Sequence, residues 1–206
     1  MKNPVIWFFR ILCVAFLGIN IYLEHSGKFI VDPEIKLILA AIFIALLTVA
    51  VNPFKGSVNK KTWLWIMFLY YLWVLANLLF FDLGFGRHAA LSGINLKPFY
   101  TIRNYLTAYE LGNITKELVV INLIGNLAAF APMAIFLPAL FRVEHNFLVF
   151  FLTIFLMVAT VEGVQYFTGT GSCDVDDLIL NVVGAMVIWV ILLPWRIIMK
   201  YKGRWQ

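Results

Sequence analysis

The feature that most limits the fold is a series of long apolar segments. A helix needs about 20 mostly apolar residues to cross the hydrocarbon core of a bilayer. Six segments reach or approach this length, at 5–23, 35–51, 62–81, 117–141, 146–167 and 176–195. The chain is 63% hydrophobic and 13% charged, whereas a soluble domain is close to half apolar. We therefore expect an all-α, polytopic membrane helix bundle with about six transmembrane helices.

The organisation expected is one membrane domain over residues 1–206, with three spans inside residues 1–81. No internal repeat or soluble linker is visible. The first segment has a basic head and an apolar stretch without a small-residue cleavage site, which favours a retained signal anchor. Cys13 falls in that segment and Cys173 in a loop, so we expect no disulfide between them.

The orientation follows from the lysines and arginines, which accumulate on the cytoplasmic side of membrane proteins. With the N-terminus inside, the inner side holds a single acid, Glu144. It also holds most of the basic residues, namely Lys2, Arg10, Lys55, Lys60, Lys61, Arg142, Arg196, Lys200, Lys202 and Arg204. We therefore predict that both termini are cytoplasmic, N-in and C-in.

The longest connection, residues 82–116, then lies outside. Much of it is apolar or aromatic, whereas a solvated loop would be more polar. We expect an interfacial segment on the membrane surface, or a re-entrant element between the helices. The net charge of +5 and the pI near 9.2 are typical of loops that contact anionic lipid. No nucleic-acid-binding pattern is present, so no nucleic acid partner is expected.

Polar side chains in the last three spans are costly in a membrane, so they usually serve packing or function. Spacings of three or four residues place them in pairs on one face of a helix. By helical rise, all lie within about 15 Å of the predicted outer ends of the spans. The sequence therefore predicts one polar pocket that opens outward, lined by Asn122, Asn126, Glu162, Gln165, Asp174, Asp177 and Asn181.

Structural roles are the alternative for these residues. Each asparagine taken singly is better explained by a hydrogen bond across helices. The three aspartates at 174, 176 and 177 can cap the sixth helix, an interpretation we prefer for Asp176 but not for Asp177, which stacks with Asn181. Gly125 and Gly184 favour close helix contact. Pro132 predicts either a kink that widens the outer half or a tolerated proline without a task.

Glu162 is the residue that packing explains least. An unpaired glutamate at that depth would take up a proton or need a cation. Arg103 and Arg87 of the outer connection are the available partners. Two lone histidines near the interface, His88 and His145, are expected to be structural.

Four stretches carry a family resemblance: NLKPF at 95–99, NLIGNLAAFAPMAIFLP, VEGVQYFTGTG and DVDDLILNVVGA. In their order and spacing they resemble the VanZ-like membrane proteins over about residues 90–190. Cys173 stands where that family usually has an aromatic residue, and Gly171 and Ser172 stand where an arginine is often found. The resemblance implies a bacterial cell-membrane protein and resistance to teicoplanin, a lipid-tailed glycopeptide that acts outside the membrane.

Three functions are compatible with these residues. In the first, a non-catalytic envelope protein binds a membrane lipid headgroup or a lipid-linked cell-wall intermediate in the outward pocket, with Arg103 among the binding residues. In the second, an enzyme acts on a phosphate-containing lipid, with Glu162 or Asp177 catalytic and Mg²⁺ or Ca²⁺ held by Asp174, Asp177 and Asn181. A transporter is disfavoured, because no inverted repeat or polar path through the inner half is present. The oligomeric state does not follow from the sequence.

Overall fold

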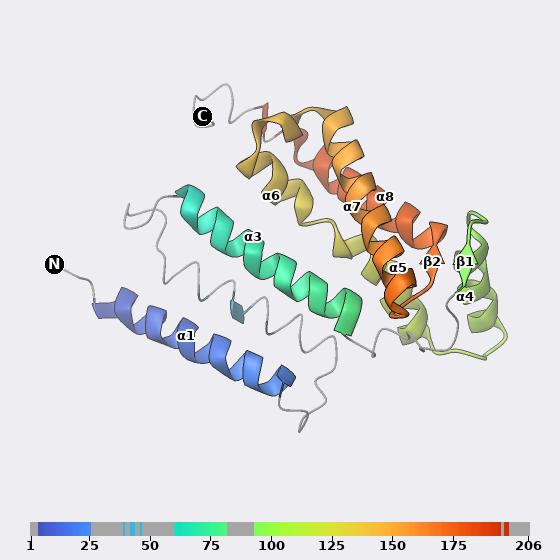
Figure 1. Ribbon diagram of the computed structural model, residues 1–206, viewed down its shortest axis with the longest axis horizontal. Helices are drawn as coiled ribbons and strands as arrows, with labels where there is room; N and C mark the ends of the chain where they lie inside the picture. Colours follow the sequence, from blue (N-terminus) through green and yellow to red (C-terminus); the bar gives the residue numbers. More distant parts are fainter. Residues whose placement is uncertain are drawn as a thin grey trace. The chain divides into compact units, whose positions relative to one another are not determined.

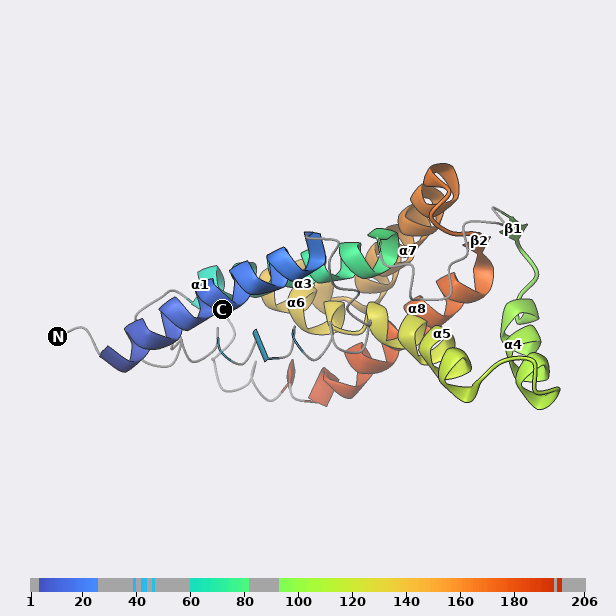
Figure 2. The ribbon, with the colours of Figure 1, turned by 90° about the horizontal axis from the view of Figure 1, so that it is seen from below.

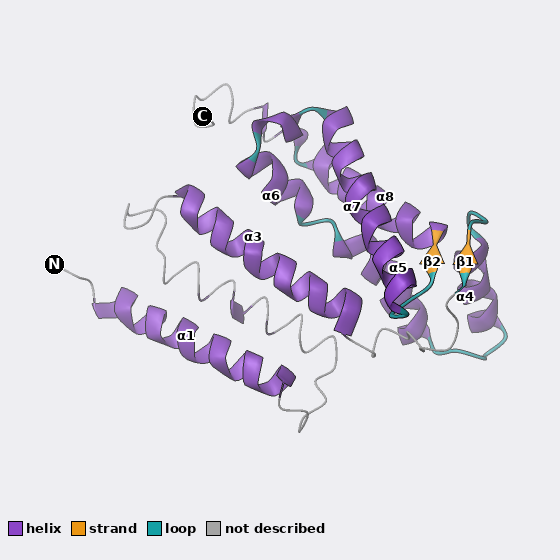
Figure 3. Cartoon of the chain, in the orientation of Figure 1, coloured by secondary structure: helices purple, strands orange, loops and turns teal. Residues whose placement is uncertain are grey.

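The computed structural model describes residues 4–25, 39, 42–43, 46, 60–81, 93–194 and 196–197. Most of these residues are helical, and the only regular exception within the described ranges is one pair of two-residue strands (Figure 3). The predicted all-α class is confirmed. Of the predicted span at 35–51 only residues 39, 42–43 and 46 are described, and the two outer-loop residues Arg87 and His88 lie outside the described residues.

The chain divides into two compact units, residues 1–78 and 79–206. Unit 1 holds α1 (Pro4–His25) and α3 (Lys60–Ala76), and a π-helix (Asn77–Phe81) follows α3. Its buried centre is formed by Cys13 and Phe43. The ring of Phe43 stacks on Phe16, with 6.3 Å between the ring centroids. The single-domain organisation stays a prediction.

Unit 2 contains the helices that position the site (Figure 1). Two of its helices are short, α4 (Tyr100–Glu110) and α6 (Met133–Leu140). The longer ones are α5 (Lys116–Ala129), α7 (Phe147–Thr168) and α8 (Val175–Ile191). A 3-10 helix (Arg142–His145) joins α6 to α7, and the strands are β1 (Ile94–Asn95) and β2 (Cys173–Asp174).

Three helical stretches among the described residues are long and apolar enough to cross a membrane: Lys61–Phe80, Lys116–Leu140 and Phe147–Thr168. They coincide with three of the six predicted spans. A shorter apolar helix covers Trp7–Tyr22, inside the first predicted span. The number of six spans stays a prediction.

The stretch Lys116–Leu140 is interrupted at Pro132, which separates α5 from α6. Proline has no backbone N–H and cannot continue the ladder of helical hydrogen bonds. The carbonyl of Ala128 instead accepts the N–H of Ala131 at 3.2 Å, which closes a tighter turn before α6 begins. Of the two outcomes considered for Pro132, the structure shows an interruption between two helices, and a widening of the outer half stays a prediction.

The closest helix packing in unit 2 is between α5 and α8, and it depends on Gly184. A Cβ atom at this position would lie 1.7 Å from the carbonyl oxygen of Leu127. Only a glycine lets the two backbones approach so closely. The predicted packing role of Gly184 is confirmed.

The two strands join segments that are far apart in sequence. β1 and β2 pair in parallel, with Ile94 opposite Cys173 and Asn95 opposite Asp174. The backbone N–H of Cys173 also donates to the carbonyl of Gly93 at 3.1 Å. This pairing holds the connection before α4 against the start of α8, as both views of unit 2 show (Figures 1 and 2).

Candidate polar site at the start of α8

The turn between α7 and α8 is formed by its glycines and by Gln165. Gly169 adopts φ 68° and ψ 16°, a left-handed conformation that ends α7 and that glycine tolerates best. The backbone carbonyl of Gln165 accepts the N–H groups of Thr170 and Gly171, at 3.0 and 3.3 Å. The chain therefore reverses within a few residues and brings Asp174 back to the end of α7.

Asp174 begins α8 and connects it to three other segments. Its side chain accepts the N–H of Asp176 at 2.9 Å, so it is the N-cap of α8. The same carboxylate accepts the Asn95 amide at 3.1 Å and the Thr101 hydroxyl at 2.5 Å. Its own backbone N–H donates to Glu162 Oε2 at 3.2 Å. Asp174 is thus a buried junction between α7, α8, β1 and α4.

Asp176 corrects a prediction, because it does not cap α8. Its fully buried carboxylate faces the N-terminus of α4 and accepts three backbone N–H groups. They belong to Phe99, to Thr101 at 2.8 Å and to Ile102 at 3.1 Å. A carboxylate at a helix N-terminus is favoured by the helix dipole and by the unpaired N–H groups of the first turn. The aspartate from α8 therefore fixes a different helix.

The segment NLKPF forms the turn that presents these N–H groups. The N–H of Tyr100 donates to the carbonyl of Lys97 at 3.3 Å, and Phe99 adopts φ 62° and ψ 10°. Pro98 then occupies the second position of a type II turn, which proline favours, while Phe99 occupies the third, which favours glycine. Because Phe99 is not glycine, its conformation is strained and is held by the bond to Asp176.

Asp177 and Asn126 join α8 to α5. The Asn126 amide donates to Asp177 Oδ1 at 2.5 Å. Asn181, which is 2% exposed, donates its amide to the backbone carbonyl of Asp177 at 2.8 Å. Its side-chain oxygen Oδ1 is buried and has no hydrogen-bond partner within the part of the chain that the structure describes. Between α5 and α8, the described residues therefore supply no hydrogen-bond donor for Oδ1 of Asn181.

Glu162 and Cys173 lie beside this junction. Glu162 is 5% exposed and its Oε2 atom is the acceptor for the Asp174 N–H. Burial raises the pKa of the Cys173 thiol, and the negative charges of Glu162 and Asp174 raise it further. The thiol is therefore kept protonated and is a weak nucleophile. Both cysteines of the chain are free, as expected.

Three predicted binding residues have other surroundings. Asn122 donates to the carbonyl of Leu118 on its own helix at 2.8 Å. The buried Gln165 amide donates to the Leu79 carbonyl at 2.7 Å. Arg103 is exposed on α4. The structure thus brings Asn126, Glu162, Asp174, Asp177 and Asn181 together, and their binding of a ligand stays a prediction.

The carboxylates fit structural roles better than a metal site. Both oxygens of Asp174 and both of Asp176 already accept N–H or O–H donors, as does Oδ1 of Asp177. Within the described ranges, no group of three or more His, Cys, Asp or Glu side chains is arranged to hold a metal ion. Of the predicted Mg²⁺ or Ca²⁺ ligands, Asp174 and Oδ1 of Asp177 therefore already accept protein donors, whereas Oδ1 of Asn181 accepts none within the described residues.

Sequence reasoning missed two members of the site, Asn95 and Thr101. Asn95 bonds Asp174 and Thr101, at 3.1 and 3.0 Å, and its own oxygen accepts the N–H of Lys97 at 3.1 Å. Asn95 could have been predicted, because it is the first residue of the NLKPF stretch that resembles the family. No sequence pattern indicated Thr101, because it lies outside the four motifs and a single threonine in an expected loop carries no specific signal. Two hydrogen-bonded sets meet at the adjacent residues Asp176 and Asp177 of α8. We call them together the polar cluster: Asn95, Thr101, Asn126, Glu162, Asp174, Asp176, Asp177 and Asn181.

Comparison with known proteins assigns the family. A profile of the VanZ/LLP1 family matches residues 68–199, well over half of the chain and a longer stretch than the four motifs cover. No curated protein and no solved structure matches the chain. With its three membrane-length helices, the chain is a membrane protein that belongs to the VanZ/LLP1 family.

Proposed function

We propose that the protein is a multi-pass protein of the bacterial cell membrane whose polar cluster binds the headgroup of a membrane lipid or of a lipid-linked cell-wall intermediate. By this binding it contributes to resistance against teicoplanin-type antibiotics, which carry a lipid tail and act outside the membrane. The predicted topology places the polar cluster at the outer face, where such lipids are accessible.

The observation that carries the proposal is the buried oxygen Oδ1 of Asn181, for which the described part of the chain supplies no donor. A buried polar atom without a partner costs about 1–3 kcal/mol, so such an atom calls for an explanation. One carboxylate lies a helical turn away, that of Asp177, which accepts the Asn126 amide. A ligand group that donates hydrogen bonds, such as a hydroxyl or an ammonium, suits these surroundings.

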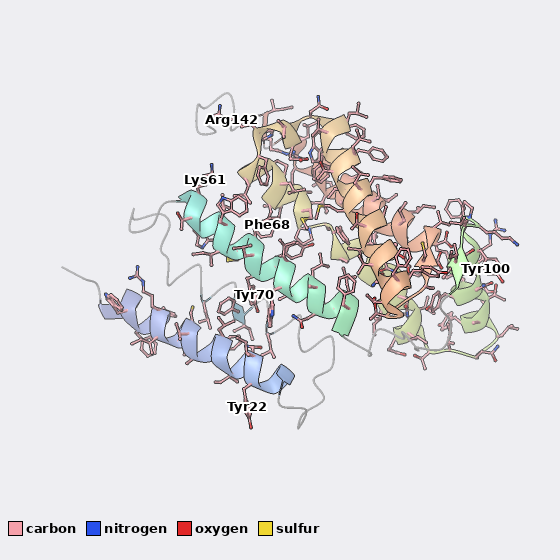
Figure 4. All side chains as sticks on the ribbon, in the orientation of Figure 1. Tyr22, Lys61, Phe68, Tyr70, Tyr100 and Arg142 are labelled. Atoms are coloured by element: carbon pink, nitrogen blue, oxygen red, sulfur yellow. The ribbon has the colours of Figure 1, made fainter. Side chains whose placement is uncertain are left out.

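The strained turn before α4 supports the same location. Residues held in sparsely populated backbone conformations cluster at functional sites, and Phe99 is such a residue. Its ring is 53% exposed and Tyr100 beside it is 52% exposed, so two aromatic side chains border the polar cluster. Figure 4 shows Tyr100 on α4, at the same end of unit 2 as the start of α8. Aromatic rings of this kind are typical of the membrane interface.

The test is the substitution Asn181→Leu in a bacterium that lacks its own copy of the protein. We expect loss of teicoplanin resistance and of co-purified lipid, measured by growth inhibition and by mass spectrometry of the lipid extract. Asn20→Leu is the control, because Asn20 also donates to a carbonyl four residues earlier, that of Phe16, but lies in unit 1. Sensitivity to a glycopeptide without a lipid tail is expected to stay unchanged. If Asn181→Leu folds and retains both resistance and lipid, the proposal is wrong.

The enzymatic alternative is separated by the same preparation. If the purified wild-type protein turns over a phosphate-containing lipid, the protein is an enzyme and the binding proposal is wrong. Loss of that turnover on chelation would restore the metal-assisted version, whereas turnover that survives chelation would leave Glu162 acting as a base without a metal. The commitment of the Asp174 and Asp176 oxygens to protein donors favours binding over catalysis.

A further inference from the structure

A second set of polar side chains lies at the opposite ends of α7 and α8. Helix α7 is about 33 Å long at 1.5 Å per residue, and Glu162 lies near its C-terminal end. Glu144 precedes its first residue, in the 3-10 helix Arg142–His145. Figure 4 shows Arg142 of this 3-10 helix far from Tyr100, at the other end of unit 2. This second set is therefore separate from the polar cluster.

Glu144 is a buried carboxylate that is only half satisfied. It is 6% exposed, and its Oε1 atom accepts the hydroxyl of Thr153 at 3.0 Å. Its backbone carbonyl accepts the indole N–H of Trp189 at 3.1 Å. Oε2 is buried and has no partner among the described residues. Oε2 of Glu144 can therefore accept a hydrogen bond from a ligand.

Arg196, whose guanidinium lies over the ring of Trp189, has buried N–H donors without acceptors among the described residues. It is 8% exposed, its Nη2 atom donates to the Trp189 carbonyl, and its Cζ atom lies 4.3 Å from the centroid of the Trp189 ring. Its Nε and Nη1 atoms are buried and, within the described ranges, lack acceptors. A guanidinium is always charged, so these donors need an anionic or polar partner.

Trp189 holds the two charged residues near one another. The ring centroids of Phe147 and Phe150 lie 5.7 and 6.0 Å from that of Trp189, and its side chain is 4% exposed. The indole is thus fixed in position, with its N–H bonded to Glu144 and the guanidinium of Arg196 over its face. Trp189 thus contacts both the backbone of Glu144, whose Oε2 accepts no donor, and the guanidinium of Arg196, whose Nε and Nη1 lack acceptors among the described residues.

These groups define the chemistry of a ligand. One carboxylate and one guanidinium sum to zero charge, so the complementary ligand is a zwitterion with an anionic and a cationic group. The site lies at the end of a membrane-length helix, where phospholipid headgroups are found. Val143, Phe147 and Ile197 beside it are 64%, 53% and 46% exposed and provide an apolar surface for acyl chains.

We propose that Glu144, Trp189 and Arg196 form a second lipid site, which binds a zwitterionic phospholipid headgroup with a primary ammonium, such as phosphoethanolamine. The phosphate accepts from Nε and Nη1 of Arg196, and the ammonium donates to Oε2 of Glu144. A choline headgroup is rejected, because its nitrogen has no hydrogen to donate. Because Oε2 of Glu144 and Nε and Nη1 of Arg196 are buried, the side chains that cover them must move for the headgroup to enter.

The test measures lipid retention by the purified full-length protein with native mass spectrometry. Phosphatidylethanolamine, its mono-, di- and trimethylated forms and phosphatidylglycerol are compared at equal acyl composition. We expect wild type to retain phosphatidylethanolamine about tenfold better than the trimethylated form, which corresponds to one hydrogen bond to a charged group. This comparison needs no variant, so it holds even if a substitution impairs folding.

Two variants then assign the partners. Glu144→Gln is expected to abolish the preference for phosphatidylethanolamine while phospholipid still binds, and Arg196→Gln to abolish binding of both forms. Arg142→Gln, an exposed neighbour in the same 3-10 helix, is the control and is expected to bind as wild type does. Equal retention of all methylated forms by wild type would overturn the proposal. So would a loss of stability in both variants without any change in lipid preference, because a direct ion pair or a water would then satisfy these atoms.

Discussion

At the scale of single residues, Asp176 fixes the start of α4, because both of its carboxylate oxygens accept backbone N–H groups there. An asparagine at position 176 offers one acceptor oxygen instead of two and turns an amide N–H₂ towards backbone donors. We predict that Asp176→Asn lowers the free energy of unfolding by about 1–3 kcal/mol. Thermal unfolding of the purified protein checks this, with hydrogen exchange at the amides of Phe99, Thr101 and Ile102, which should become faster.

Thr107→Ala provides the control on the same helix, because Thr107 is exposed on α4. It should leave both the unfolding temperature and the exchange of these amides unchanged. If Asp176→Asn unfolds at the wild-type temperature with protected amides, the start of α4 does not depend on the Asp176 carboxylate.

The raised pKa of the Cys173 thiol gives a second prediction at this scale. A raised pKa means less thiolate at a given pH, so alkylation of Cys173 by iodoacetamide at pH 8 should be slower than that of a free cysteine. Because the charge of Glu162 contributes to the shift, Glu162→Gln should lower the thiol pKa and speed the reaction. Rates measured from pH 7 to 10 give the pKa directly. An unchanged rate profile would mean that Glu162 is uncharged or too distant to act on the thiol.

The sequence predicted part of the polar cluster, but it also included Asn122, Gln165 and Arg103, which lie in other surroundings, and it did not predict what each member would bond. Spacing along two helices predicted that Asn126 of α5 lies level with Asp177 and Asn181 of α8, and Asp177 bonds both. The same logic assigned Asp176 to α8, because a carboxylate in the first turn of a helix usually caps that helix. Its real partner, the start of α4, lies 75 residues earlier for Thr101. No local pattern encodes a contact at that separation.

At the scale of elements, the close crossing of α5 and α8 depends on one glycine. Gly184→Ala places a methyl group 1.7 Å from the backbone of Leu127, so one helix must shift. Overpacking of this kind costs about 1–3 kcal/mol. Gly163→Ala in α7 is the matched control, because a Cβ there has no atom within 4 Å. We expect a lower unfolding temperature for the first and an unchanged or slightly higher one for the second, since alanine favours a helix. Equal unfolding temperatures would contradict the tight crossing.

Long elements were more predictable than short ones, for a physical reason. A span of about 20 apolar residues is visible in composition alone, and the helices at 61–80, 116–140 and 147–168 were expected within a few residues. Two-residue strands show no periodicity, so the pairing of Ile94–Asn95 with Cys173–Asp174 was not predicted. The helix α4 was expected only as an interfacial or re-entrant segment, since Gly93 and Pro98 suggested a loop.

At the scale of the whole molecule, the buried polar side chains of unit 2 described above lie in two groups, one at each end of α7. The polar cluster lies at the C-terminal end of α7 and the Glu144–Arg196 site before its N-terminal end, with apolar side chains such as Phe150, Ile154 and Val158 buried between them. A continuous polar path between the two ends would suit a transporter, whereas two separate sites suit a protein that contacts each leaflet independently. This arrangement makes the orientation in the membrane decisive for function.

The orientation is tested by single cysteines at exposed positions near the two ends of unit 2, in a Cys13→Ala, Cys173→Ala background. Thr107→Cys on α4 and Val143→Cys in the 3-10 helix are both exposed sites. Because lysine and arginine accumulate on the cytoplasmic side, Val143, which adjoins Arg142, should face the cytoplasm. An impermeant maleimide should therefore label Thr107→Cys in intact cells and Val143→Cys only after the membrane is opened. The reverse pattern would place the polar cluster inside, out of reach of antibiotics that act on the cell surface, and both the topology and the proposed role in resistance would then fail together.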